Sequence, residues 1–263
     1  MTGNSEFQTV DAHGWRGGLN NLLRLEFGKW WGSSMWWIQT LIWVVVINGI
    51  LAPIVWSEDA PGEVEGVMLY AVFSGLFTSI AVVVIMQDAI VGERESGTAA
   101  WVLSKPASRS AFVLAKWVAS LFGVLVTMLV LPGIVAYLQI SLSAGSWLNP
   151  LDFLLGLGVL WVVLLYFLSL TLMLGTLFQH RGPVIGIPLA LAFGQQLLFG
   201  MLPILSYILP WTLAVPAGEF ETSVAGALIS GQQPHSLLPL VISSISIVLF
   251  LAVSLWRFQR EEL

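Results

Sequence analysis

The segment Gly92–Lys116 reads GERESGTAAWVLSKPASRSAFVLAK and is the densest run of mixed charge in a very apolar chain. Long apolar runs lie on both sides of it. A polar break between two apolar runs of membrane length is typical of a loop that joins two membrane spans. Its position therefore decides how the chain is divided into spans. Its charged residues are Glu93, Arg94, Glu95, Lys105, Arg109 and Lys116.

The composition is that of an integral membrane protein. Of the 263 residues, 57% are hydrophobic and 10% are charged, whereas a soluble domain has roughly 25% charged residues. The chain has no cysteine, which excludes disulfides and thiolate metal sites.

Six apolar segments approach or exceed the roughly 20 residues that a helix needs to cross a bilayer. We therefore expect an all-α integral membrane protein with one six-span domain over residues 34–256. Residues 1–29 contain no apolar run, so we expect no cleavable signal peptide and a first span that serves as an uncleaved anchor. The predicted spans are 34–56, 66–86, 112–140, 153–178, 183–205 and 237–256.

The positions of the basic residues predict the orientation. All ten Lys and Arg fall in the N-terminal segment, the 87–116 loop, the turn at 179–182 and the 257–263 tail. The three other loops contain acidic residues and no basic ones. With six spans, the positive-inside rule places both termini in the cytoplasm of a multi-pass protein of the cell membrane.

Residues 1–33 are expected to form a cytoplasmic N-terminus that ends in an amphipathic helix. Leu19, Leu22, Leu23, Phe27 and Trp30 follow helical spacing, and polar residues occupy other angles. Such a helix is expected to lie in the inner membrane interface. A plain anchor and a mechanical role both fit this pattern.

Several kinds of chemistry are not supported by the sequence. There is no GxxxxGK[ST] phosphate loop, so the chain does not hydrolyse ATP through that motif. The three histidines have no partner at metal-ligand spacing, and no catalytic residue or metal site is expected. The predicted spans contain no central Asp, Glu, Lys or Arg of the kind that ion-coupled carriers use. The energy for any transport must then come from outside the membrane.

Three amide side chains lie near the middle of predicted spans: Asn48 in the first, and Gln195 and Gln196 in the fifth. They can form hydrogen bonds between helices, or they can line a substrate path. The fifth span also has a small-residue face that permits close helix packing, either within one subunit or across a dimer. This face consists of Gly182, Gly186, Ala190 and Gly194.

The segment after the fifth span is apolar but is interrupted by Pro203, Pro210 and Pro216. It is too short and too broken to cross the membrane again. We expect a re-entrant or outer helical hairpin between Leu205 and Leu228, before the last span.

The Gly92–Lys116 segment has both signs of charge, so attraction to lipid explains it poorly. Pro106 breaks the chain, and SRSAFVLAK is expected to start a helix with Ser108 or Ser110 as its cap. A short charged helical piece against the inner face suits docking of another protein. An ordinary solvated loop is the alternative.

The same segment resembles the signature loop of the ABC-2 type exporter permeases. The matching residues follow the family pattern in order: a Glu-rich start, Gly-Thr, an apolar stretch, Pro-x-x-Arg, and a Lys that leads into a helix. The resemblance extends over the whole chain, including the six spans and the tail RFQREEL. The matching residues are Glu93, Glu95, Gly97, Thr98, Pro106, Arg109 and Lys116.

The resemblance implies a transmembrane subunit without cofactors of its own. It would pair with a second permease copy or paralogue and be driven by a separate P-loop ABC ATPase that binds ATP and Mg. It implies no nucleic-acid partner. The 87–116 loop would contain a coupling helix, and the amides of the first and fifth spans would face a translocation path. Some members instead act mechanically on an extracytoplasmic partner, and that alternative stays open. The residues expected to contact the ATPase are Asp88, Glu93, Arg94, Glu95, Gly97, Thr98, Pro106, Arg109 and Lys116.

Overall fold

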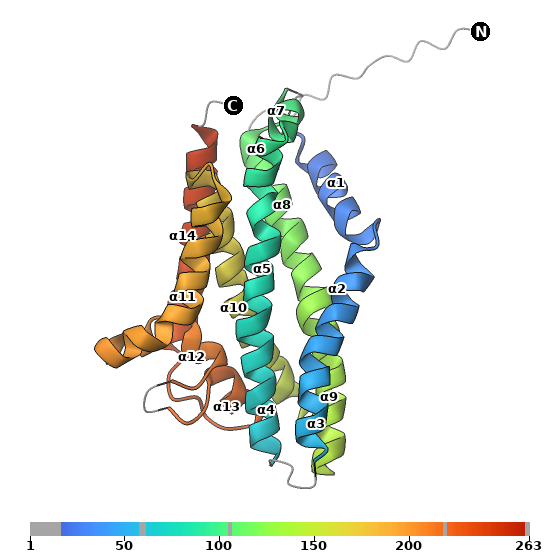
Figure 1. Cartoon of the computed structure of the whole chain (residues 1–263), viewed down its shortest axis with the longest axis vertical. Coiled ribbons are helices and arrows are strands. Elements are labelled where there is room, and N and C mark those ends of the chain that lie inside the picture. Colours follow the sequence, from blue (N-terminus) through green and yellow to red (C-terminus); the bar gives the residue numbers. More distant parts are fainter. Residues whose placement is uncertain (1–16, 58–61, 105–106, 218–219, 261–263) are drawn as a thin grey trace, which may run out of the picture.

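The computed structural model describes residues 17–57, 62–104, 107–217 and 220–260. All regular structure in these residues is helical, as predicted, and the long helices form an elongated bundle (Figure 1). The helices are α1 (Leu19–Trp31), α2 (Met35–Trp43), α3 (Gly49–Val55), α4 (Glu63–Val72), α5 (Thr78–Gln87), α6 (Glu93–Glu95), α7 (Thr98–Leu103), α8 (Arg109–Val124), α9 (Leu131–Ala144), α10 (Pro150–Leu177), α11 (Arg181–Met201), α12 (Trp211–Ala214), α13 (Val224–Ile229) and α14 (Leu238–Gln259).

Five continuous helices in the described residues are long and apolar enough to cross a membrane. They coincide with five of the predicted spans. The remaining predicted span, 183–205, falls on α11, a helix of 21 residues that is not among these five. The count of six therefore stays a prediction. The five helices are Met35–Val55, Glu63–Glu95, Arg109–Ala144, Pro150–Leu177 and Leu238–Gln259.

The second and third long helices extend well beyond the predicted spans, with 33 and 36 residues. Most of the predicted 87–116 loop is therefore helical. Charged side chains do not end a helix when they can reach partners or water, and the first long helix of this pair ends only where Gly97 adopts a left-handed conformation with φ of 71°. Ser108, one of the two predicted caps, caps the start of α8 by accepting a hydrogen bond from the amide of Ala111.

Four π-helical turns interrupt the first three long helices, and the last of them adjoins a proline. Pro132 lies inside the third long helix, where it cannot donate a backbone hydrogen bond. The wider turn directly before it keeps the helix continuous. The π-helical turns are η1 (Val44–Asn48), η2 (Phe73–Phe77), η3 (Asp88–Gly92) and η4 (Leu125–Val130).

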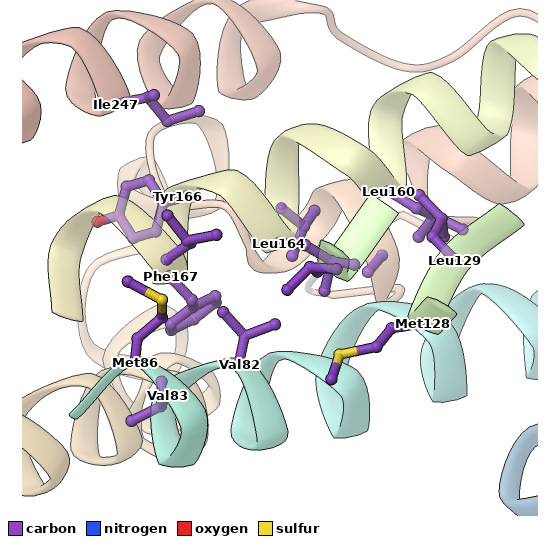
Figure 2. Close-up of a cluster of buried hydrophobic side chains, with 14 of the residues drawn as sticks. Val82, Val83, Met86, Met128, Leu129, Leu160, Leu164, Tyr166, Phe167 and Ile247 are labelled. Carbon is purple, nitrogen blue, oxygen red and sulfur yellow. The ribbon is translucent and has the colours of Figure 1, made fainter. Parts of the chain in front are cut away.

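Helix α10 forms the centre of the bundle. Leu160, Leu164 and Leu168 are fully buried along it. Figure 2 shows Leu164 and Phe167 of this helix facing side chains of α5, including Val82 and Met86. Since α10 packs against α5, α11, α13 and α14, it is the framework that holds the other helices in register.

Helix α1 packs along α8 and runs obliquely to it (Figure 1). The buried ring of Trp30 lies over Gly123, where an added Cβ would come within 2.3 Å of the ring. A second aromatic contact joins Phe27 to Phe122. The predicted helix exists, and one of its faces is held by the bundle; its position in a membrane interface stays a prediction.

The segment between α11 and α14 forms short helices at the end of the bundle opposite α6 and α7 (Figure 1). An added Cβ at Gly75 would lie 2.2 Å from the Cβ of Ala214 in α12, and one at Gly156 would lie 2.2 Å from Cγ1 of Ile229 in α13. The chain at the end of α11 turns sideways out of the bundle (Figure 1). The predicted hairpin is thus a set of short packed helices, and its depth in the membrane stays a prediction.

Candidate functional site

The described basic residues gather at the end of the bundle that holds α6, α7 and the C-terminus of α14 (Figure 1). We call the side chains that join the helices here the hub. They lie on the segment from Asp88 to Lys116 and on the helix ends that surround it. The predicted ATPase-contact residue Pro106 lies outside the described residues.

A cluster of two carboxylates and two ammonium groups joins α1, α6 and α8. The Nζ of Lys116 lies 2.6 Å from Glu93 and 3.0 Å from Glu26. The Nζ of Lys29 lies 2.8 Å from each of the same two carboxylates. The Lys116 side chain is only 3% exposed, so its charge is compensated inside the protein. The cluster has a formal charge of zero, as a buried ionic group requires.

The partners also act on the ionisation of Lys29, which lies outside the long helices. Burial alone would lower the pKa of the Lys29 ammonium group. The hydrogen bonds and negative charges of Glu26 and Glu93 outweigh burial and hold the pKa above its ordinary value. Lys29 is therefore charged at any physiological pH.

Arg94 joins the same segment to the end of α10. Its guanidinium group donates hydrogen bonds to the carbonyls of Gly175 and Phe178, at 2.9 and 3.1 Å. A cation at a helix C-terminus satisfies carbonyls that have no donor within the helix and interacts favourably with the helix dipole. The guanidinium group also lies 5.8 Å from the ring of Phe258 in α14.

Two half-exposed ion pairs join the segment to the start of α11. The guanidinium group of Arg181 lies 2.9 Å from Glu95 and 3.2 Å from Asp88. One arginine with two acidic partners therefore links the 179–182 turn to the segment.

The end of α14 is attached to the start of α8. Arg109 donates a hydrogen bond to the carbonyl of Gln259 at 3.3 Å, and the Gln259 amide donates to the hydroxyl of Ser110 at 2.6 Å. The rings of Phe112 and Phe258 stack with centroids 5.4 Å apart. The segment, which includes the start of α8, thus contacts α1, α10, α11 and α14, so displacing it would pull on most of the bundle.

The separate short helix of this region is apolar rather than charged, which differs from the prediction. The charged triplet Glu93–Glu95 continues the preceding long helix, and α7, with the sequence TAAWVL, follows the turn at Gly97. The hydroxyl of Thr98, at the start of α7, lies 2.9 Å from that of Ser96. Trp101 on α7 is 61% exposed and borders a groove of about 320 Å³ between α7 and α1.

Two of the amides predicted to line a substrate path form hydrogen bonds between helices. Asn48 is buried and donates to the carbonyl of Pro132 at 3.2 Å. Gln195 is buried and accepts from the amide of Trp211 at 3.0 Å, which attaches α11 to α12. The side chain of Gln196 lies outside the described part of the structure. The structure thus shows the hydrogen-bonding alternative for Asn48 and Gln195, and the path stays a prediction.

The predicted small-residue face of α11 is uncovered in the single subunit. Gly182, Gly186 and Ala190 are exposed, and Gly194 is half-buried. No atom lies within 4 Å of a Cβ added at any of its three glycines. Among the described residues, the three glycines of this face make no close helix contact within one subunit, and a contact between subunits stays a prediction.

The sequence analysis did not predict Glu26, Lys29, Arg181 or Gln259 as parts of this site. One feature of the sequence indicated an ion pair at Glu26: it is the single acidic residue of α1 and stands three positions before Lys29. No spacing rule relates Glu26 to Lys116, which is 90 positions away. The described residues contain no group of three or more His, Cys, Asp or Glu that could hold a metal ion.

An all-helical bundle with several apolar helices of membrane length, and charges confined to its ends, defines a multi-pass membrane protein. The family model for ABC-2 family transporter proteins matches residues 21–263, and the chain belongs to this family. It is therefore a permease subunit of an ABC transporter, a class of membrane subunit that is generally non-catalytic and associates with an ABC ATPase. A comparison with curated proteins found no match.

Proposed function

We propose that this chain is the membrane subunit of an ABC exporter of the cell membrane, with six spans and both termini in the cytoplasm. A separate ATPase binds ATP and Mg and drives it, and two permease subunits form the dimer. The orientation is supported by the described basic residues, which gather at one end of the bundle. The dimer is supported by the exposed small-residue face of α11.

The hub is the single observation that carries this proposal. An ATPase that docks on the segment from Asp88 to Lys116 would act through ion pairs and hydrogen bonds on four other helices, α1, α10, α11 and α14. Glu93 and Lys116 transmit this displacement from inside the protein, because their charges are paired with each other and with α1. The contact surface itself is then formed by α7, with Trp101 exposed on it, and by the half-exposed pair of Glu95 and Arg181.

The experiment compares the same substitution at the two ends of the bundle. Trp101→Glu adds a charge on α7, and Trp147→Glu adds one to an equally exposed tryptophan at the opposite end. Each variant is purified from native membranes, and ATP hydrolysis is measured in the purified material. We expect Trp101→Glu to lose the bound ATPase and Trp147→Glu to retain it. Wild-type ATP hydrolysis in both preparations would refute docking on α7.

A second candidate is mechanical action on an extracytoplasmic partner, without passage of a small molecule. It is supported by the closed surroundings of the two described amides, since the cavity beside Gln195 has a volume of about 10 Å³. Cross-linking of Gly186→Cys in α11 to the same residue of the second subunit separates the candidates, because Gly186 is exposed on the proposed dimer face. Export predicts that a cross-link between the two α11 helices blocks function, whereas a mechanical role through a closed interface predicts that function is retained.

A further inference from the structure

A cavity of about 310 Å³ opens at the end of the bundle opposite the hub, between the ends of α3, α4 and α9. Its floor is apolar and is formed by Val55, Gly66 and Ile140, which are all buried. An added Cβ at Gly66 would lie 3.3 Å from Cγ1 of Val55 and 3.9 Å from Ile140. The depth of the cavity therefore depends on a glycine at position 66.

The electrostatic surroundings of this cavity favour a cation. Helices α3 and α9 both end at it, with Val55 and Ala144 in its wall. The last carbonyls of a helix have no donor within the helix, and the helix dipole is negative at that end. Glu63 adds a carboxylate to the rim. The positive start of α4 also lies here, but its first turn contains Glu63 and Glu65, which offset it.

The protein supplies no cation of its own here among the described residues. The described residues of the connections at 57–65, 141–152 and 206–236 contain no Lys or Arg. Within the described part of the chain, the Glu63 carboxylate accepts a long hydrogen bond from the hydroxyl of Ser146, at 3.4 Å. A carboxylate and two helix C-termini around an apolar floor thus form a site of negative potential that is open to a cationic ligand.

We propose that this cavity binds a primary organic ammonium ion with a small apolar body. An ammonium group has three donors, which fit the Glu63 carboxylate and the terminal carbonyls of α3 and α9. The carbonyls of Ile54 and Leu142 already accept from Ser57 and Gly145 and offer only a second lone pair. The apolar body would cover the floor around Gly66. The volume lies at the lower end of the range of about 300–1,000 Å³ that ligand pockets occupy. A metal ion fits poorly, because the described residues lack a group of three His, Cys, Asp or Glu.

Two sources can provide this chemistry: a free amine, or the headgroup of an aminophospholipid. The exposed side chains of Trp56 and Trp147 lie at this end, as is typical of a membrane interface. Lipid headgroups can therefore reach the cavity. The site does not depend on the proposed transport function, and a test of binding alone addresses it.

The test uses the full chain in nanodiscs of phosphatidylcholine, with cyclohexylammonium as the probe and cyclohexanol as its neutral counterpart. Binding is measured by saturation-transfer NMR titration. We expect Glu63→Gln to weaken binding about tenfold or more, because it removes a charge-assisted hydrogen bond. Gly66→Val should abolish binding by filling the floor. Glu65→Gln, in the same helical turn but outside the cavity wall, is the matched control and should bind like the wild type.

Three results would overturn the proposal: wild-type binding by Glu63→Gln, an equal loss in Glu65→Gln, or equally tight binding of cyclohexanol. Glu63 is exposed, so its loss leaves the fold intact and a negative result is not a folding defect. Replacing phosphatidylcholine with phosphatidylethanolamine then identifies the source. Competition with the probe assigns the site to the lipid headgroup, and unchanged probe binding assigns it to a free amine.

Discussion

At one end of the bundle, Lys116 is buried among carboxylates, whereas at the other end Glu63 stands at the rim of an open cavity. Most ion pairs of the hub join the charge of one helix to that of another and so hold two helices together; the pair of Lys29 and Glu26 lies within α1. The opposite end exposes a carboxylate and helix C-termini with no basic residue of the described chain beside them. The difference shows that charged side chains of the hub bind helices to one another, whereas the carboxylate at the opposite end is exposed to a ligand from outside the chain.

The largest expected effect concerns which side of the membrane each end faces. A reporter that is active only outside the cytoplasm is fused after Ser104, after Ser146 or at Leu263. We expect activity only after Ser146, since the described basic residues lie at the hub end. Reporter activity at Leu263 together with no activity after Ser146 would mean that the hub end faces outward, and the predicted orientation would be wrong.

The next largest expected effect is a loss of stability when the buried ammonium group of Lys116 is removed from the hub. Lys116→Met leaves Glu26 and Glu93 with only the half-exposed Lys29 as a partner. Breaking a buried pair by removing one partner costs about 3–5 kcal/mol, so thermal unfolding in detergent should begin at a clearly lower temperature.

Lys29→Met is the matched control for this change, because it removes the same group from the same cluster at a site that is 47% exposed. Its effect should stay within about 1 kcal/mol. Equal stability of Lys116→Met and the wild type would show that the cluster does not hold α1 to α8.

A smaller effect is expected where α1 packs against α8 without charge. Gly123→Ala places a methyl group within 2.3 Å of the Trp30 ring, so α1 must shift. Such overpacking costs about 1–3 kcal/mol. Gly158→Ala, on the exposed side of α10 with no atom within 4 Å, is the control and should not destabilise the protein. Thermal unfolding of the two variants compares them directly, and equal stability would place α1 outside the packed bundle.

The sequence predicted the helical class, the positions of the long helices and the Ser108 cap, because apolar runs of membrane length and cap residues are local signals. It placed the end of the second span too early, at residue 86, whereas the helix start near Ser108 was predicted. Predicted spans stop where charge begins, but the helix continues to Glu95 because its carboxylates have partners on other helices. The left-handed turn at Gly97 is the true break.

The partners within the hub could not be predicted in the same way. Lys116 was predicted to contact another protein, and its burial between Glu26 and Glu93 depends on how α1 crosses α8. Such a crossing follows from side-chain packing between distant segments, for which one sequence gives no spacing rule. The same limit applies to the cavity at the opposite end, which exists only because three helix ends meet.

The smallest expected effect lies in the hub itself, at the exposed pair of Glu95 and Arg181. A double-mutant cycle with Glu95→Gln and Arg181→Gln should give a coupling energy of about 0.2–1 kcal/mol that falls as salt is added. Thermal unfolding at low and high salt measures it, and a cycle of Glu95→Gln with Arg260→Gln, for which the structure shows no ion pair, should give no coupling. This pair and that of Asp88 link the segment to α11 by charge, so a weak coupling means that these ion pairs contribute little to the attachment of α11, which also packs against α5 and α10. A coupling energy as large as the destabilisation by Lys116→Met would mean that charge holds α11 to the segment as firmly as it holds α1. That result would contradict the prediction.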